Sequence, residues 1–397
     1  MTLWLGAAIL VVLCLFWLNR LYDLIQSWRK VPKLSAPVDV SDSSDLPLIS
    51  VIVPAHNEEA TITKCIDSIL DQDYPRVELI VVDDRSSDAT FQLALKACEG
   101  RDSCRIIRLH ELLPGWTGKC HALNKGVQHA SGDWLAFLDA DTRLNRNALT
   151  SVYFLAVKRG VSLVTLTPRF ILINFWEKAL QPIFSATFCI LFPPGSVNDQ
   201  KSPVAMANGM FYLIQRNAYD EIGGHEAVKN LAVEDVGIGK RAKAAGVGIL
   251  VANGSQLMET RMFNGFKDTL EGWTRILSAC MDYRIGSILK YLLVHLAVSL
   301  PVYCVGMYFF IKGAYHLWPT TLYMLPLLTS LLIAIVPYFF LKEMGLPPSY
   351  APLLMIGNLF LIWVHMVILK RVIFGDTLEW RGTRYKWFRY EPGKLDP

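Results

Sequence analysis

The chain has 397 residues, of which 52% are hydrophobic and only 19% are charged. This composition is more apolar than that of a typical soluble enzyme. The formal net charge of +4 is too small to indicate nucleic-acid binding. We therefore expect a membrane-associated protein with no nucleic-acid partner.

The eight cysteines are scattered along the chain and include no CxxC pair. This spacing argues against a disulfide framework and against a structural zinc site. We expect reduced thiols that face the cytosol.

The N-terminal stretch "TLWLGAAILVVLCLFWLN" contains 18 uncharged residues, enough to cross a bilayer. No basic region precedes it and no small-residue cleavage site follows, so an anchor is favoured over a cleaved signal peptide. Basic residues just after it place that side in the cytosol. We predict a transmembrane helix over 1–25, followed by a Pro/Ser/Asp-rich linker over 26–45.

The segment 46–260 alternates strand and helix patterns. The stretches "LISVIVPAHNEE", "VELIVVDDRSSDAT", "CRIIRLH" and "DWLAFLDADT" read as strands and are separated by helical patterns. This alternation predicts an α/β fold with a parallel sheet covered on both faces. Ligands of such sheets bind outside the carboxyl ends of the strands.

Polar clusters follow three of these strands, and "DWLAFLDADT" is the most informative. Asp139 and Asp141 are two residues apart on an extended chain, so their carboxylates share a face. A hard divalent cation such as Mg²⁺ or Mn²⁺ relieves their repulsion, and Mg²⁺ commonly binds together with substrate phosphates. The alternative is a solvated turn, in which Asp is favoured by local hydrogen bonds.

Four stretches taken together resemble family 2 glycosyltransferases: "ISVIVPAHNEE", "ELIVVDDRSSDAT", "ASGDWLAFLDADT" and "VEDVGIGKRAKAAG". The resemblance covers roughly 46–260. It implies a GT-A fold, a nucleotide diphosphate sugar as donor, with a UDP-sugar favoured, and Mn²⁺ or Mg²⁺ as cofactor.

The resemblance also implies roles for individual residues. Asp139 would lie near the ribose and sugar, and Asp141, with Asp139, would bind the metal. Asp84, with Asp83, would contact the nucleobase. The remaining nucleotide-pocket residues would be Pro54, Ala55, Asn57 and Glu58.

In "LAVEDVGIGKRAKAAG", the resemblance implies that Asp235 is the general base of an inverting reaction and that Glu234 supports it. The alternative is a pair of acids that stabilise a helix N-terminus. In "LLPGWTGKCHALNKG", Lys119 can meet a phosphate and Trp116 can close over the base or sugar. The alternative there is a flexible surface loop.

The acceptor side is indicated by aromatic-rich segments. We predict an interfacial amphipathic helix near 170–195, with a core helix as the alternative. A connector over 261–290 contains Trp273 and Arg275 in "EGWTRI" but lacks the (Q/R)xxRW motif of processive relatives. His225 lies in a loop that could face the acceptor. Apolar runs predict C-terminal transmembrane helices within 291–372, followed by a basic tail over 373–397.

The stretches "FPPGSVND", "EGWTR" and "WRGTRY" are similar to those of bacterial hopanoid-associated and carotenoid (diaponeurosporenoate-type) glycosyltransferases. This implies a lipid acceptor and an integral protein of the bacterial inner membrane, with its catalytic domain facing the cytoplasm. Two alternatives stay open. One is a glycosyltransferase that acts on polyprenyl phosphate, and the other is a non-catalytic membrane protein with a degenerate transferase domain.

Overall fold

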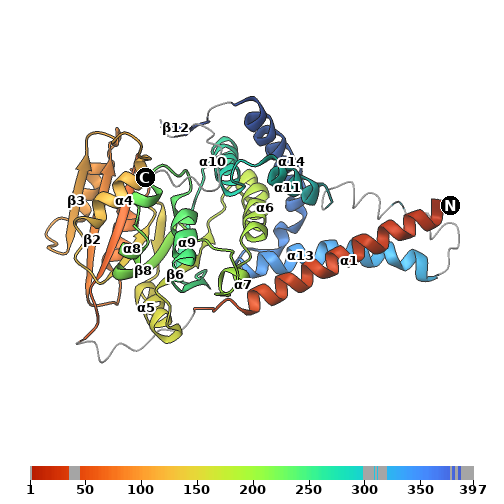
Figure 1. Cartoon of the computed structure of the whole chain (residues 1–397), viewed down its shortest axis with the longest axis horizontal. Helices are drawn as coiled ribbons and strands as arrows, with labels where there is room; N and C mark the ends of the chain where they lie inside the picture. The colour runs from red at the N-terminus through yellow and green to blue at the C-terminus, as the bar shows by residue number, and fades with distance from the viewer. Residues whose placement is uncertain are drawn as a thin grey trace. The chain divides into compact units, whose positions relative to one another are not determined.

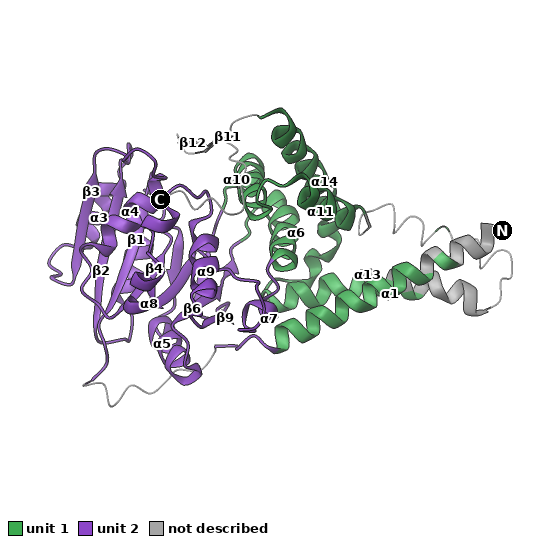
Figure 2. Cartoon of the chain, viewed as in Figure 1, with its two compact units in different colours: residues 1–29, 172–191, 263–397 green, residues 30–171, 192–262 purple. Residues whose placement is uncertain are grey.

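A computed structural model of the chain describes residues 2–34, 45–297, 308, 311, 320–375, 378–380 and 383–385. It contains two compact units, coloured separately in Figure 2. Unit 1 comprises Met1–Arg29, Leu172–Leu191 and Phe263–Pro397, and unit 2 comprises Lys30–Ile171 and Phe192–Met262.

Unit 2 is built on a sheet of seven described strands in the order β3-β2-β1-β4-β8-β6-β9. Figure 1 labels β3, β2, β8 and β6 of this sheet. The first four in chain order are parallel where they pair, and β8 runs antiparallel to both β4 and β6. The predicted mostly parallel sheet is confirmed. The bounds are β1 Ile49–Ala55, β2 Val77–Asp84, β3 Cys104–Leu109, β4 Trp134–Leu138, β6 Leu163–Thr167, β8 Phe211–Gln215 and β9 Ile249–Asn253.

The central strands are buried on both faces, as their continuous apolar sequences require. Amphipathic helices supply the covering side chains; α2, for example, buries Ile62, Cys65, Ile66 and Ile69. The helices of this unit are α2 Ile62–Leu70, α3 Thr90–Ala97, α4 Gly118–Val127, α5 Ala148–Arg159, α7 Pro194–Val197, α8 Arg216–Glu221 and α9 Glu234–Ala244, with the 3-10 turn η1 Glu226–Val228.

A second sheet in unit 2 has the order β5-β10-β7 among the described strands. It joins the segment after the DxD pair to two later parts of the chain. Its strands are β5 Thr142–Leu144, β7 Arg169–Phe170 and β10 Met258–Thr260.

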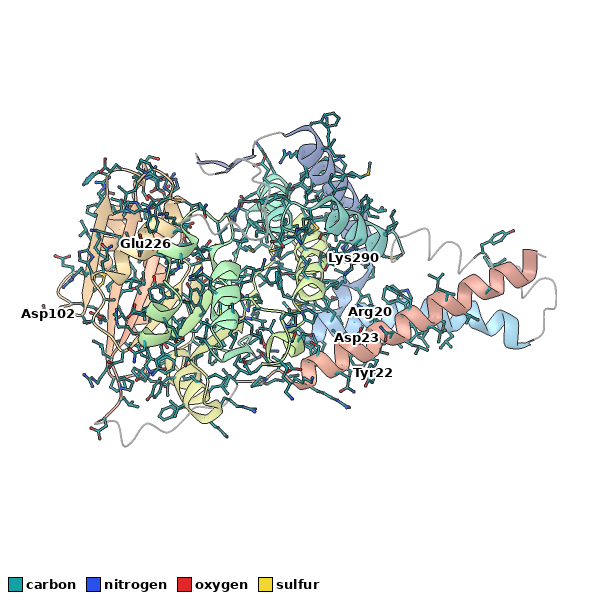
Figure 3. The ribbon with its side chains drawn as sticks, viewed as in Figure 1. Arg20, Tyr22, Asp23, Asp102, Glu226 and Lys290 are labelled. Carbon is teal, nitrogen blue, oxygen red and sulfur yellow. A yellow bond between two sulfur atoms is a disulfide. The ribbon has the colours of Figure 1, made fainter. Side chains whose placement is uncertain are left out.

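Unit 1 consists mainly of helices. They are α1 Thr2–Arg29, α6 Phe175–Leu191, α10 Gly265–Cys280, α11 Ile285–Ala297, α13 Thr320–Glu343 and α14 Ala351–Phe374, with η2 Pro348–Tyr350 and the short pair β11 Leu378–Trp380 and β12 Thr383–Tyr385. Cys14 and Trp17 of α1 pack with Leu332 of α13. Figure 3 labels Arg20 and Asp23 on α1, whose side chains pair at 2.6 Å.

Helices occupy most of the described residues in the two predicted membrane regions, 1–25 and 291–372. Among the described residues, two helical runs are long and apolar enough to cross a membrane, Phe175–Val197 and Pro348–Phe374. Only the length and apolar composition of these two runs support a membrane-spanning role. Within the predicted membrane region 291–372, residues 298–307, 309–310 and 312–319 lie outside the described residues, as does most of the basic tail.

Three boundaries differ from those predicted. The N-terminal helix continues to Arg29. Residues 30–34 belong to unit 2, where Pro32 O accepts a hydrogen bond from Asn253 N at 2.8 Å. The segment 172–191, expected within the catalytic domain, is grouped with unit 1 because α6 packs against α10 and α14.

The expectation that the thiols are reduced is wrong for Cys98 and Cys104, which form a disulfide. They flank the turn between α3 and β3, which brings their Cα atoms to 5.7 Å, a separation that suits a disulfide. The other described cysteines, which are not part of this disulfide, are Cys14, Cys65, Cys120, Cys189 and Cys280.

Candidate active site

The carboxyl ends of β1, β2 and β4 lie at one edge of the large sheet, and the chain turns sharply after β4. Thr142 N donates to Asp139 O at 3.0 Å, which closes the turn that carries the DxD pair. Asp141 Oδ1 accepts from the hydroxyls of Thr142 and Thr260, each at 3.3 Å. The pair is therefore held by both sheets of unit 2.

Lys119 lies at the centre of the acidic residues at this edge. Its Nζ is 2.7 Å from Asp139 Oδ1 and 2.8 Å from Glu234 Oε1. Lys119 is the second residue of α4, whose start is fixed by the Thr117 hydroxyl accepting from Cys120 N. The lysine thus joins the end of β4 to the start of α9.

Glu234 and Asp235 begin α9, where carboxylates are stabilised by the helix N-terminus. Asp235 accepts two backbone hydrogen bonds, from Gly209 N at 2.6 Å and from Val236 N at 2.8 Å. A Cβ at Gly209 would lie 2.9 Å from Asp235 Oδ2 and 3.0 Å from Lys119 Nζ. Only glycine leaves room for both groups here.

The two acids of this pair differ in pKa. Burial raises the pKa of Asp235, the neighbouring Glu234 raises it further, and Lys119 lowers it, with a result of about 6. Burial also raises the pKa of Glu234, but its contact with Lys119 outweighs that effect and holds it below the usual value. For Lys119, burial lowers the pKa, but Asp139, Glu234 and Asp235 together raise it well above the usual value. Asp235 is thus suited to accept a proton near neutral pH.

The two aspartates that end β2 have separate surroundings. Asp84 is paired with Arg85, whose Nε lies 2.8 Å from Asp84 Oδ1. A Cβ at Gly118 would lie only 2.2 Å from Asp84 Oδ2, so the start of α4 approaches this carboxylate closely. Asp83 is almost fully buried, and Arg108 Nε of the neighbouring strand β3 lies 3.4 Å from its Oδ2. Asp83 therefore has a cross-strand partner, and Asp84 is the better candidate to contact a base.

The residues after β1 tie two loops together. Asn57 has a left-handed backbone with φ +56°, which Asn tolerates better than most residues. Its Oδ1 accepts from Ser87 N at 2.8 Å. Glu58 N donates to Thr90 Oγ1 at 2.7 Å, and Glu58 Oε2 accepts from the Thr61 hydroxyl at 2.9 Å.

Pro54 and Ala55 are the last residues of β1 and pair in register with Val82 and Asp83 of β2. They bring the loop that carries Asn57 and Glu58 to the strand edge predicted for the nucleotide.

The predicted acceptor-side position of His225 is wrong. His225 is fully buried, and its two ring nitrogens contact the hydroxyls of Tyr212 at 3.0 Å and Tyr219 at 2.8 Å. Burial lowers the pKa of His225 to about 3. A neutral imidazole with both nitrogens occupied is a core residue.

Trp273 and Arg275 belong to α10 of unit 1. Trp273 is buried, where its Nε1 donates to Gln181 Oε1 at 2.8 Å and its ring stacks on Phe184. The predicted acceptor contact of Trp273 is therefore replaced by packing between α10 and α6. Arg275 is half-buried on the same helix.

Trp116 lies in the loop before α4, as predicted. Lys229 Nζ is 5.8 Å from the centre of the Trp116 ring, and Thr117 N donates to Lys229 O at 2.7 Å. These contacts join the end of the loop to Lys229.

Asp139 and Asp141 fit Mn²⁺ or Mg²⁺ by the chemistry of their donor atoms, since hard divalent cations prefer carboxylate oxygen. Among the described residues, no group of three or more His, Cys, Asp or Glu could hold a metal ion. Asp139 and Asp141 would supply two carboxylates to such a cation, and a diphosphate and water would complete the coordination.

Sequence reasoning missed Gly209 and Thr260, which position Asp235 and Asp141 through the contacts described above. Neither residue lies in a recognised motif, and each reaches the site only through long-range pairing. The contact between Lys119 and Glu234 was also missed, because the lysine was expected to meet a phosphate.

Comparison with known proteins shows what part of the chain is similar to a known family. Residues 50–223 match the model of glycosyl transferase family 2. The matched segment contains the strand ends, the DxD pair and Lys119, and it ends before Glu234 and Asp235.

Two curated relatives are 4,4'-diaponeurosporenoate glycosyltransferases of Staphylococcus aureus. The protein of strain MRSA252 is 31% identical over 241 residues, which cover 58% of this chain and 60% of the relative. That of strain USA300 is 30% identical over 240 residues with the same coverage. The chain thus matches about 60% of the length of these relatives.

The fold is shared with a solved structure, the mannosyltransferase PcManGT from Pyrobaculum calidifontis in complex with GDP-Man and Mn²⁺. The TM-score is 0.50 at 19% sequence identity, and the alignment covers 94% of this chain and 98% of the other. The predicted GT-A α/β fold is confirmed.

Proposed function

We propose that the protein is an inverting glycosyltransferase that transfers a sugar from a nucleotide diphosphate sugar to a membrane lipid. The observation that carries this proposal is the convergence of Asp139, Lys119, Glu234 and Asp235 at the strand edge of a family 2 domain. That edge is where open α/β sheets bind their ligands.

Asp235 acts as the general base. Two backbone N–H groups hold its carboxylate, and its raised pKa suits proton transfer near neutral pH. It takes the proton of the acceptor hydroxyl while that oxygen bonds to the anomeric carbon of the sugar. The bond from this carbon to the diphosphate breaks in the same step, so the configuration inverts.

Asp139 and Asp141 would hold Mn²⁺ or Mg²⁺, which when bound supplies positive charge for the leaving diphosphate. Lys119 adds a second positive charge within reach of the same site. The Mn²⁺ named with the structural neighbour supports this assignment. Asp84, with Asn57 and Glu58 on the adjoining loop, would hold the nucleoside part of the donor.

A lipid acceptor is supported by the relatives and by unit 1. The relatives are named for transfer to a carotenoid acid, and the run Pro348–Phe374 is long and apolar enough to cross a bilayer. We propose an integral protein of the bacterial inner membrane with unit 2 in the cytoplasm. A hopanoid, a carotenoid or another glycolipid precursor would be the acceptor.

A polyprenyl phosphate acceptor has less support. It would require a basic cluster beside Asp235, for which Lys240, Arg241 and Arg261 are the candidates. Arg241 Nε instead donates to Ile222 O at 2.5 Å, at the end of α8. A degenerate, non-catalytic domain would leave no reason to keep the Lys119 and Asp235 contacts.

The test uses the full chain in detergent with Mn²⁺, a panel of UDP- and GDP-sugars, and a bacterial lipid extract. Nucleotide release and new glycolipid masses are measured together. We expect one donor to give a new lipid mass whose anomeric configuration is opposite to that of the donor. Retained configuration would contradict the inverting mechanism, and no release from any donor would favour the degenerate domain.

A further inference from the structure

We propose that Lys119 competes with the divalent cation for Asp139, so that the cation binds tightly only together with a diphosphate. This proposal rests on the proposed function, in which Asp139 and Asp141 hold the metal. It assigns Lys119 a role in the order of binding, in addition to its expected contact with a phosphate.

The ammonium group of Lys119 lies against one carboxylate of the proposed metal site. Lys119 Nζ lies 2.7 Å from Asp139 Oδ1, a carboxylate oxygen that would otherwise be available to the metal. A divalent cation that shares this oxygen must approach within a few ångströms of a positive charge. Two like charges at that distance repel strongly in a partly buried site.

Glu234 holds the Lys119 side chain in this position. Glu234 Oε1 is 2.8 Å from Lys119 Nζ, and this carboxylate is only 7% exposed. Glu234 starts α9, whereas Asp139 follows β4, so the ammonium is held from two separate elements. Gly209 leaves the space that Nζ occupies, since a Cβ there would lie 3.0 Å from it.

Binding of a diphosphate would release Lys119 from Asp139. A diphosphate brings oxygen acceptors that can replace Asp139 as a partner of the ammonium group. The lysine side chain is a flexible four-carbon stem with three rotatable donors, so it can turn from one partner to the other while α4 stays fixed. Asp139 then becomes available to the cation, and binding of cation and diphosphate is mutually favourable.

The test measures binding rather than turnover. Free Mn²⁺ is quantified by electron paramagnetic resonance in titrations of the full chain in detergent, with and without UDP. For the wild type we expect UDP to tighten Mn²⁺ binding by about 30-fold or more, within the usual range of coupling between two ligands. In Lys119→Met, Mn²⁺ alone should bind about tenfold more tightly, and the effect of UDP should shrink to about threefold or less.

Lys125→Met is the matched control. Lys125 lies on the same helix, and its Nζ is 3.3 Å from Gln128 Oε1. It should bind Mn²⁺ as the wild type does. Lys119→Gln keeps a polar group without the charge and should repeat the result of Lys119→Met, even if the methionine variant folds poorly.

The outcomes separate the two proposals. If the wild type binds Mn²⁺ with UDP but both Lys119 variants bind Mn²⁺ alone no more tightly than it does, competition is overturned and the proposed function stands. If Asp141→Ala binds Mn²⁺ and UDP as the wild type does, the metal site of the proposed function is wrong, and the competition proposal falls with it.

Discussion

Asp235 differs from its neighbour Glu234 in its pKa, which burial and Glu234 raise to about 6, whereas the pKa of Glu234 is held below its usual value. A raised pKa means that the carboxylate takes up a proton at a higher pH than an ordinary aspartate. The Asp235 carboxylate is therefore ionised and able to accept a proton above about pH 6, whereas below that pH it is protonated and inactive as a base.

We predict that kcat/KM for sugar transfer falls about tenfold per pH unit below about pH 6. Glu234→Gln removes a charge that raises the pKa of Asp235, so this limb of the profile should move to lower pH. Initial rates between about pH 4.5 and 8 measure both effects. A limb at the same pH in the variant would show that another group titrates.

Gly209→Ala should impair catalysis because its Cβ would displace Asp235 Oδ2 or Lys119 Nζ. A displacement of about 1 Å in a catalytic group can cost about 100-fold in rate, so we expect kcat to fall by roughly 10- to 100-fold. Gly286→Ala is the control, since a Cβ at Gly286 meets nothing within 4 Å. Equal kcat values in the two variants would contradict the tight fit at Gly209.

At the scale of elements, the strand ends could be predicted because β1, β2 and β4 are short apolar runs that stop at polar residues. The DxD pair and the acids of α9 followed from the resemblance. His225 could not be predicted, because its burial depends on Tyr212 and Tyr219, which come from β8 and α8. A histidine that follows two glycines is typical of an exposed loop, and the contacts with the two tyrosines form only in the folded unit.

The packing of α6 was also difficult to predict. Its sequence mixes aromatic residues with Glu177 and Gln181, which suggested an interface with lipid. In the structure these two side chains are buried and bonded within unit 1, Glu177 to Gly265 N and Gln181 to Trp273. Their partners lie about 90 residues later in the chain, beyond any local pattern.

Gly357→Ala should destabilise unit 1. Gly357 of α14 faces α6 so closely that its Cβ would lie 2.0 Å from Ala179 O, a backbone atom that cannot move aside. Overpacking of this kind costs about 1–3 kcal/mol. Thermal unfolding in detergent, with Gly286→Ala as the matched glycine-to-alanine control, measures the loss. An unchanged midpoint in Gly357→Ala would contradict the close contact of the two helices.

At the scale of the whole molecule, the sequence predicted a transferase domain combined with apolar helices, and the GT-A fold is confirmed. The sequence could not predict which segments build each unit, because 172–191 lies between two parts of unit 2 in the chain. The sequence also could not predict the acceptor lipid, since the choice of lipid depends on the shape of an acceptor site and not on a motif.

Integration into a bilayer gives a prediction of its own. The full chain expressed in bacteria should remain in the membrane pellet after washing at alkaline pH, because apolar helices of unit 1 would cross the bilayer. Detergent should release it. Immunoblotting of the fractions provides the measurement, and release by alkaline washing alone would indicate a peripheral protein.

We propose that the acidic residues at the strand edge of unit 2 form the catalytic centre, with Asp235 as the general base. The decisive measurement compares Mn²⁺-dependent UDP binding and sugar transfer in the wild type and in Asp235→Asn. We predict that Asp235→Asn binds UDP within about threefold of the wild type but loses transfer by about 1,000-fold, which is within the usual contribution of a general base. Transfer at the wild-type rate in Asp235→Asn would contradict the account.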